Sequence, residues 1–137
     1  MKLYDEEWVA ELARRAASDE SFQKKARGFD ALYQYVVKPP KGSASVEPAT
    51  FWIKFPEAVE FGVGPHAAPT FTMTTSYEIF HDVLLGKTNA VMALTMRKIF
   101  VAGDLMRLLR FTGAINRIVE LMQGIPAQAE AGLSAIA

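Results

Sequence analysis

The chain of 137 residues contains no cysteine. A disulfide framework, a thiol nucleophile and a cysteine-ligated metal are therefore excluded. Two histidines are present, His66 and His81, and Glu78 precedes His81 by three residues. Helical carboxylate metal sites need two such E-x-x-H pairs and further carboxylates, so one pair is too few. We interpret His81 as part of a solvated helix face, place His66 in a turn and predict no metal site.

Motifs of common catalytic and cofactor sites are missing as well. No G-x-S-x-G nucleophile elbow occurs. The stretch "GVGP" at residues 62–65 has neither the following helix nor the spacing of a phosphate loop or a dinucleotide fingerprint. We therefore predict no catalytic residue, no cofactor and no enzymatic activity. An enzyme that uses a buried polar pair, assembled only in three dimensions, remains the least favoured alternative.

Neither sign of charge is in excess, because 15 basic and 15 acidic side chains give a formal net charge of zero. A general nucleic-acid binder normally has a basic surplus, so we expect no nucleic-acid partner. The first residues, "MKLYDEEW", have no apolar run after the lysine and do not read as a signal peptide. No stretch approaches the roughly 18 apolar residues of a membrane span. We expect a soluble protein in the cytoplasm.

The charges are nevertheless unevenly distributed along the chain. Residues 1–22 carry three basic and six acidic side chains, whereas residues 87–123 carry six basic and two acidic ones. The C-terminal region is therefore the basic pole of the molecule.

Apolar residues are plentiful although no run of them is long: half of the chain is hydrophobic. Trp8, Leu12 and Ala16 follow helical spacing, and a second short helix is expected before Gly28. Period-two alternation predicts strands in the segments 29–37, 50–55, 59–64, 69–75 and 98–103. The short connections between the first four favour an antiparallel meander.

Capping residues predict the remaining helices. Thr75 and Glu78 form a T-x-x-E capping box, and Gly86 ends the helix that they open. A further short helix follows Thr88 or Asn89. The last helix is expected to run without interruption from Asp104 to the glycine at 124, with one half apolar and the other half bearing Arg107, Arg110 and Arg117. Periodicity alone favours an ordinary core helix; the alternative is a helix that closes over an apolar ligand.

The motifs between residues 70 and 111 follow a specific order. A T-x-T-like strand runs into a Ser/Thr-capped helix that contains Phe80 and ends in Leu85-Gly86-Lys87. A second helix, a strand that leads into Gly103-Asp104 and a long amphipathic helix follow. This order resembles the sterol carrier protein family, type-two class, over residues 5–124, while residues 125–137 are expected to be a loosely docked tail.

The resemblance implies an α+β fold, with a five-stranded, mostly antiparallel sheet and helices packed on one face. It also implies an apolar tunnel between the sheet and the helices that holds a lipid. The residues that we expect to line this tunnel share the inward apolar faces of the predicted elements. They are Phe51, Ile53, Phe71, Met73, Phe80, Val83, Leu84, Met92, Met96, Leu105, Leu108, Leu109, Thr112, Ile115, Val119 and Met122.

Two departures from the family pattern concern the last strand. Arg97 stands where the family usually has glycine, and Phe100 and Ala102 stand where lysines often alternate. The outward face of this strand is therefore unusually apolar, which suggests a covered edge, a dimer contact or a membrane-facing patch. The lipid class stays open among fatty acids, acyl-CoAs, sterols, phospholipids and prenyl quinones.

The favoured function is binding and transfer of a lipid without catalysis. The alternative is an accessory domain that presents a lipid-like substrate to partner enzymes. We expect Arg107, Arg110 and Arg117 to contact anionic membrane transiently, although solvation of these arginines or pairing with N-terminal acids is nearly as well supported. A homodimer or a complex with a partner enzyme also remains open.

Overall fold

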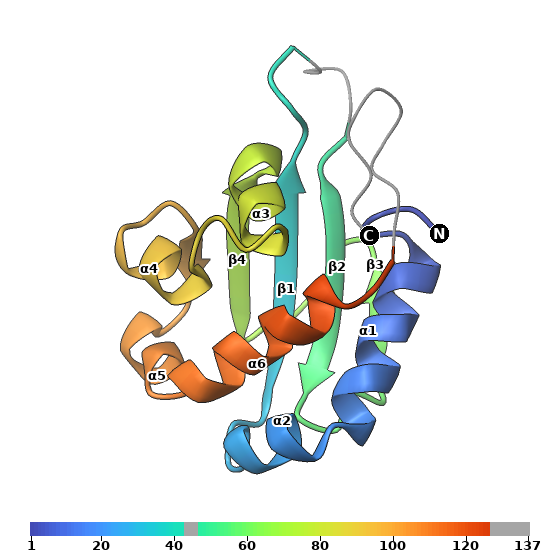
Figure 1. The fold of residues 1–137 in the computed structure, drawn as a ribbon, viewed down its shortest axis with the longest axis vertical. Coiled ribbons are helices and arrows are strands. Elements are labelled where there is room, and N and C mark those ends of the chain that lie inside the picture. Colours follow the sequence, from blue (N-terminus) through green and yellow to red (C-terminus); the bar gives the residue numbers. More distant parts are fainter. Residues whose placement is uncertain (43–46, 127–137) are drawn as a thin grey trace.

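The computed structural model describes residues 1–42 and 47–126 (Figure 1). Within those ranges the chain forms five strands and six helices. The strands are β1 (Ala31–Lys38), β2 (Ala49–Phe55), β3 (Phe61–Val63), β4 (Phe71–Ser76) and β5 (Phe100–Ala102). The helices are α1 (Glu6–Ser18), α2 (Glu20–Lys25), α3 (Tyr77–Leu84), α4 (Ala90–Thr95), α5 (Leu105–Leu109) and α6 (Thr112–Gln123).

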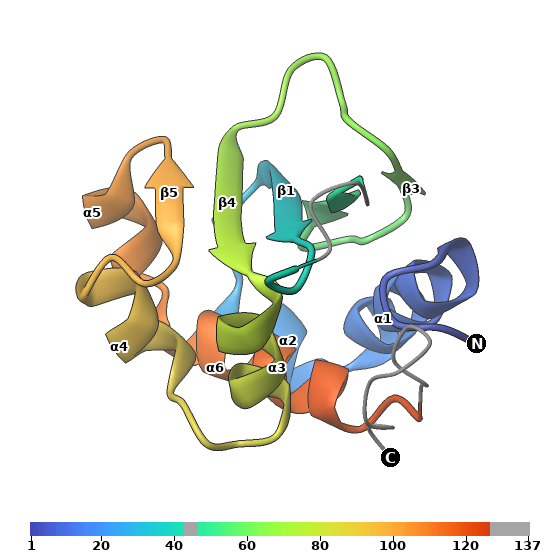
Figure 2. The same cartoon turned by 90° about the horizontal axis from the view of Figure 1, so that it is seen from above.

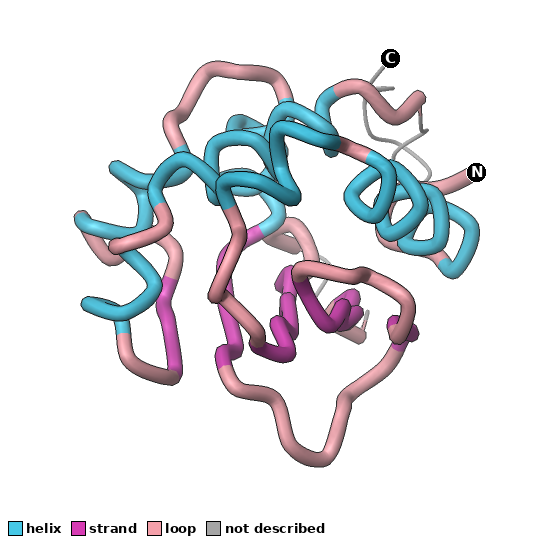
Figure 3. The backbone as a smooth tube through the Cα atoms, turned by 90° about the horizontal axis from the view of Figure 1, so that it is seen from below, coloured by secondary structure: helices cyan, strands magenta, loops and turns pink. Residues whose placement is uncertain are grey.

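The strands form one mixed sheet in the order β3–β2–β1–β4–β5. Neighbouring strands are antiparallel except β1 and β4, which run parallel with Tyr33 opposite Phe71. The predicted α+β class and mostly antiparallel sheet are confirmed, but the predicted meander is wrong. The connection between β3 and β4 is a crossover that places β4 beside β1, on the far side from β2 (Figures 2 and 3).

The crossover and the helices cover opposite faces of the sheet (Figure 2). Helices α2, α3 and α6 lie on the face opposite the crossover, and α5 lies beside the β5 edge (Figure 2). Alternate residues of β1 point towards the helices, so Tyr33, Tyr35 and Val37 are buried on that face. The predicted alternation of this strand therefore directs one row of its side chains into the space beneath the helices.

The buried amide of Gln34 holds the crossover against the outer face. Its Oε1 accepts the backbone N–H of His66 at 2.7 Å, and its Nε2 donates to Thr72 Oγ1 at 3.3 Å. The Trp52 ring of β2 lies over Gly62 of the neighbouring strand β3, and its centroid is 4.6 Å from that of the His66 ring. Trp52 therefore packs against the crossover of its own chain.

Helix α3 begins one residue later than a cap at Thr75 would require. Ser76 is the N-cap, and its hydroxyl accepts the Ile79 N–H at 3.1 Å. Thr75 is still in β4, where its hydroxyl donates to the Lys98 carbonyl at 3.4 Å. The predicted capping box of Thr75 and Glu78 is therefore wrong, because the parallel pairing with β1 extends to Ser76.

The predicted long last helix is two helices, α5 and α6. The backbone leaves helical geometry at Phe111, with φ −110° and ψ 41°. The Phe111 ring stacks on Phe29 with centroids 3.8 Å apart. Packing of this ring at the junction stabilises a change of direction that helical periodicity does not reveal, so the predicted apolar half is divided between two axes (Figure 1).

The described chain extends beyond the predicted domain limits at both ends. Leu3 and Tyr4 are buried, and Ile125, which we expected in the tail, is 1 % exposed. The N–H of Ile125 donates to the Met122 carbonyl at 3.1 Å. The rest of the predicted tail, from residue 127, lies outside the described residues.

Candidate functional site

One part of the interior is solidly packed. The Trp8 side chain of α1 meets Phe51 of β2 edge to face, with centroids 5.4 Å apart. Tyr35 of β1 stacks on Phe51, with ring centroids 4.7 Å apart. Trp8, Phe51 and Ile53 have no exposed surface. Aromatic packing of this kind stabilises the fold and leaves no room for a ligand beneath α1.

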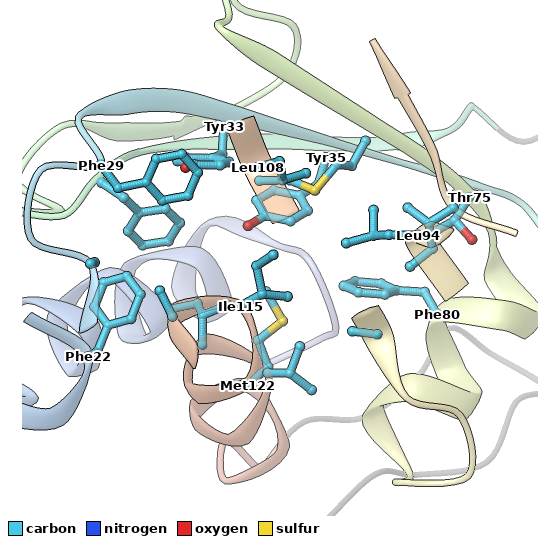
Figure 4. A pocket seen from close by; sticks show the side chains of 18 of the residues that line it. Phe22, Phe29, Tyr33, Tyr35, Thr75, Phe80, Leu94, Leu108, Ile115 and Met122 are labelled. Atoms are coloured by element: carbon cyan, nitrogen blue, oxygen red, sulfur yellow. The ribbon is translucent and has the colours of Figure 1, made fainter. Parts of the chain in front are cut away.

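The other part of the interior holds an apolar cavity, between strands β1 and β4 and the helices α2, α3, α4, α5 and α6 (Figure 4). The space open to the centre of a water-sized sphere measures about 60 Å³. A single water needs roughly 10–15 Å³ on this measure, so the cavity is larger than a packing defect. Its lining residues are Phe22, Ala26, Phe29, Tyr33, Tyr35, Val37, Phe55, Met73, Thr75, Phe80, Ala90, Leu94, Ile99, Leu108, Ala114, Ile115, Ile118, Val119 and Met122.

None of these lining residues is charged. The polar side chains among them are Tyr33, Tyr35 and Thr75 (Figure 4). Burial raises the pKa of both tyrosine hydroxyls above the ordinary value, so both stay neutral. The Tyr33 hydroxyl is buried and has no hydrogen-bond partner among the described residues. The cavity therefore suits a molecule that is mostly apolar.

Six of the sixteen predicted ligand-binding residues line this cavity. Three elements supply five of them: Phe80 from α3, Leu108 from α5, and Ile115, Val119 and Met122 from α6. The sixth is Met73 of β4. The structure thus brings together residues that are up to 49 positions apart, counted from Met73 to Met122.

The other ten predicted residues lie outside the lining, in three kinds of surroundings. Five belong to the packed core and are at most 4 % exposed: Phe51, Ile53, Phe71, Val83 and Leu84. Leu105 and Leu109 are partly buried in α5. Met92, Met96 and Thr112 are exposed, because α4 turns Ala90 and Leu94 inward and the break at Phe111 turns α6 away from α5.

Thirteen lining residues were not predicted, and five of them come from α2 and β1. Phe22 and Ala26 occupy adjacent turns at and just after α2, and Tyr33, Tyr35 and Val37 alternate along β1. The alternation of β1 is visible in the sequence. What the sequence does not show is that β1 lies in the centre of the sheet, opposite α6.

The three arginines predicted to contact membrane have different surroundings. Arg117 forms an ion pair with Asp19, with Nη2–Oδ1 at 2.7 Å and Nε–Oδ2 at 2.9 Å. The Arg107 guanidinium lies 5.8 Å from the Phe71 ring centroid and donates to the Asp30 carbonyl at 3.4 Å. Arg110 is exposed. Pairing with an N-terminal acid, the alternative considered above, is thus seen for Arg117.

His81 is partly buried rather than fully solvated. Its ring meets Tyr77 edge to face with centroids 5.3 Å apart, and its Nε2 is buried without a hydrogen-bond partner. No group of three or more acids and histidines suited to a metal ion occurs among residues 1–42 and 47–126. In the same ranges, no helix is long and apolar enough to cross a membrane.

Comparison with known proteins places this fold among the sterol carrier proteins. Residues 9–116 match the model of the SCP-2 sterol transfer family. Because the match covers most of the chain, the chain belongs to the SCP-2 sterol transfer family. No curated protein matches it.

Solved structures show the same fold at low identity. A sterol carrier protein 2 crystal structure superposes with a TM-score of 0.82 at 16 % identity, covering 90 % of this chain and 99 % of the other. A Thermus thermophilus protein described as possibly a sterol carrier protein has a TM-score of 0.79 at 16 % identity, covering 90 % and 89 %. Sterol carrier protein 2 of Aedes aegypti, solved with palmitate, has a TM-score of 0.54 at 17 % identity, covering 88 % and 98 %.

Proposed function

We propose that the chain binds a lipid in this cavity and transfers it without catalysing a reaction. The observation that carries the proposal is the uncharged, almost wholly apolar lining of the cavity. An apolar cavity gives little stabilisation to water and favours an apolar occupant. The complex of the Aedes aegypti relative with palmitate supports the same class of ligand.

The cavity must widen to accept a long lipid, since its volume in the free chain is small. We propose that the walls supplied by α6 and β4 rearrange. Met73 and Met122 lie on these two walls, and methionine adapts readily to irregular apolar shapes. The other predicted residues that we propose to contact the lipid are Phe80, Leu108, Ile115 and Val119.

Contact with an anionic membrane is a second part of the proposal. Large apolar side chains that are 59–70 % exposed lie on the consecutive elements α4, β5 and α5. These four residues, which we call the methionine end, are Met92, Met96, Phe100 and Met106. The turn between α4 and β5 adds the exposed basic residues Arg97 and Lys98, and the exposed Arg110 follows α5. Apolar residues beside basic ones fit the surface of an anionic bilayer, and Arg107 would add to the charge, whereas Arg117 is neutralised by Asp19.

The lipid-binding proposal is tested by filling the cavity. Ala114 of α6 is 3 % exposed and lines the cavity, so Ala114→Leu should occupy space that a lipid needs. We expect saturable binding of fluorescent fatty acids by the parent chain and at least tenfold weaker binding by the variant, with the free energy of unfolding little changed. Native mass spectrometry should show a co-purifying lipid with the parent and much less of it with the variant.

Ala13→Leu is the matched control. Ala13 is 1 % exposed on α1, outside the cavity lining, so the added carbons have no void to enter. Overpacking of this kind costs about 1–3 kcal/mol of stability, and lipid affinity of the folded fraction should be unchanged. A parent chain that binds no lipid above background would refute the proposed function.

A further inference from the structure

Two tyrosine hydroxyls belong to a cavity that is otherwise almost entirely hydrocarbon. Tyr33 and Tyr35 alternate along β1, so both side chains point from the sheet towards the helices. They are 4 % and 8 % exposed. In Figure 4 the hydroxyl of Tyr35 projects into the space between the sheet and α6. Within residues 1–42 and 47–126, the buried Tyr33 hydroxyl has no hydrogen-bond partner.

A buried hydroxyl without a partner is destabilising, because it has lost its hydrogen bonds to water and gained none in the protein. Phenylalanine would occupy the same space without this cost. At Tyr33 the ring already packs against Phe29 and Phe71, with centroids 5.2 and 5.3 Å away. The hydroxyl therefore contributes nothing visible to the stability of the free chain.

We infer that the hydroxyls of Tyr33 and Tyr35 donate hydrogen bonds to an uncharged carbonyl oxygen, of a ketone, quinone or ester, on the lipid in the cavity. This inference rests on the proposed lipid-binding function and narrows the class of lipid. A carbonyl oxygen accepts hydrogen bonds but donates none. It is therefore a suitable partner for neutral hydroxyls whose O–H groups are free to donate.

An ionised head group does not fit the same place. Burial raises the pKa of both tyrosines, so neither hydroxyl ionises at neutral pH. None of the described residues that line the cavity is basic, and the Arg107 guanidinium is directed to Phe71 and the Asp30 carbonyl. A carboxylate taken inside would be desolvated without a cation to balance it, which is strongly unfavourable. The carboxylate of a fatty acid would therefore remain outside while its chain entered.

Three probes of similar length separate these cases: tridecan-2-one, tridecane and laurate ion. Each is titrated against the whole chain loaded with the uncharged fluorophore N-phenyl-1-naphthylamine, and displacement gives its affinity. The variant is Tyr33→Phe combined with Tyr35→Phe. Because parent and variant meet the same probe, the solubility of the probe cancels in the comparison.

We expect the variant to bind tridecan-2-one about ten- to a hundredfold more weakly than the parent, because each of the two lost hydrogen bonds contributes about three- to tenfold in affinity. Its affinity for tridecane and for laurate should be unchanged. The carbonyl stretch of ¹³C-labelled ketone should lie at lower wavenumber in the parent complex than in the variant complex, since a hydrogen bond weakens the C=O bond.

Tyr4 provides the matched control. Its hydroxyl is also buried and without a hydrogen-bond partner, and its side chain is 7 % exposed, but it lies outside the cavity lining. Tyr4→Phe should raise the melting temperature, as should Tyr33→Phe, because each removes a buried hydroxyl without a partner. Only the cavity variant should lose ketone affinity.

Two results would overturn the inference while leaving lipid binding intact. One is undiminished ketone affinity in the double variant, which would indicate that the hydroxyls hydrogen-bond to a trapped water and not to the carbonyl oxygen. The other is an equal loss for ketone and alkane, which would show an effect on packing. Failure of the parent chain to bind tridecane, tridecan-2-one or laurate would instead refute the proposed function, and the inference with it.

Discussion

Asp19 shows how one carboxylate can position two helices. Its Oδ2 accepts the Phe22 N–H at 2.8 Å and so caps α2. The same carboxylate receives two hydrogen bonds from Arg117 of α6. These hydrogen bonds are the main cause of a pKa lowered to about 2 for Asp19. Because α2 and α6 both line the cavity, this ion pair holds two of its walls together.

The lowered pKa predicts a specific dependence of stability on pH. A carboxylate whose folded-state pKa lies below its unfolded value stabilises the fold above the unfolded pKa, near 4. That contribution is lost as the pH falls towards about 2. We expect Asp19→Asn, which retains a good N-cap, to be less stable than the parent at pH 7. The difference in melting temperature should shrink between pH 4 and pH 2.

Glu11 is the other described carboxylate whose pKa is lowered to about 2, chiefly by its hydrogen bonds from Arg14 and Arg15. Glu11 is protonated over the same pH range in the parent and in Asp19→Asn, so its effect cancels in the difference between their melting temperatures. Glu11→Gln combined with Asp19→Asn tests this cancellation. A difference between parent and Asp19→Asn that stays constant from pH 7 to pH 2 would contradict the role assigned to the ion pair.

Helices α3 and α4 end in the same hydrogen-bonded turn but with different residues. After α3, Gly86 has φ +76°, and the N–H of Lys87 donates to the Asp82 carbonyl at 2.8 Å. After α4, Arg97 has φ +59°, and the N–H of Lys98 donates to the Ala93 carbonyl at 2.8 Å. Both are Schellman turns, whose left-handed residue is usually glycine.

Exchanging these two residue types should change stability in opposite directions. A residue with a Cβ destabilises the folded state by about 1–2 kcal/mol when its backbone is left-handed. Glycine avoids this strain, but its greater freedom in the unfolded chain cancels part of the advantage. We expect Arg97→Gly to raise the free energy of unfolding by about 0.5–1 kcal/mol. Gly86→Ala should lower it by about the same amount. Urea unfolding of both variants measures this, and a destabilised Arg97→Gly chain would show that the Arg97 side chain makes a stabilising contribution of its own.

Local signals predicted the elements better than their connections. Alternation, caps and Gly86 predicted the five strands, the end of α3 and the start of α4, since these signals are properties of neighbouring residues. Whether Thr75 or Ser76 caps α3 depends on how far β4 pairs with β1, which is a long-range property. The break at Phe111 depends on stacking with Phe29, 82 residues earlier in the chain. Helical periodicity contains no trace of such a contact.

The predicted site shows the same limit. Periodicity separates inward from outward faces, and six inward residues do line the cavity. It does not tell packed interior from empty interior, so Phe51 and Val83 looked equivalent to Phe80. The difference arises because α1 fills the space beside β2, whereas the side chains of residues 1–42 and 47–126 leave a cavity between β1 and α6.

At the scale of the whole molecule, the cavity and the methionine end lie close enough to share elements. Helix α4 turns Leu94 towards the cavity and Met92 towards solvent. Helix α5 does the same with Leu108 and Met106. If the methionine end contacts a bilayer, the elements that touch the membrane are those that line the lipid site. Docking would then place the cavity beside the lipid that it receives or delivers.

Lipid transfer between vesicles tests this arrangement. We expect Met106→Gln combined with Arg110→Gln to slow transfer from anionic vesicles at least about fivefold at low salt, since one basic residue near such a surface contributes about 1 kcal/mol. Lipid affinity should be unchanged, and the difference should diminish at high salt.

Val59→Gln combined with Lys2→Gln is the control for the transfer assay, because both residues are exposed and lie outside the methionine end. It should transfer lipid as fast as the parent. Equal rates for the parent and the Met106/Arg110 variant would contradict membrane docking at this end. They would favour instead the presentation of the lipid to a partner protein.

The parallel pairing of β1 with β4 has a consequence for how the chain folds. Leu32 and Thr70, which are hydrogen-bonded across this pair, are 38 residues apart, and α6 follows later still. Closing such a long loop loses chain entropy before the pairing compensates for it, and folds rich in distant contacts form slowly. The walls of the cavity therefore meet late, and a nascent or partly folded chain has no lipid site. A lipid that binds only the completed fold would slow unfolding and draw the equilibrium towards the native state, so each cargo molecule would also protect its carrier from proteolysis.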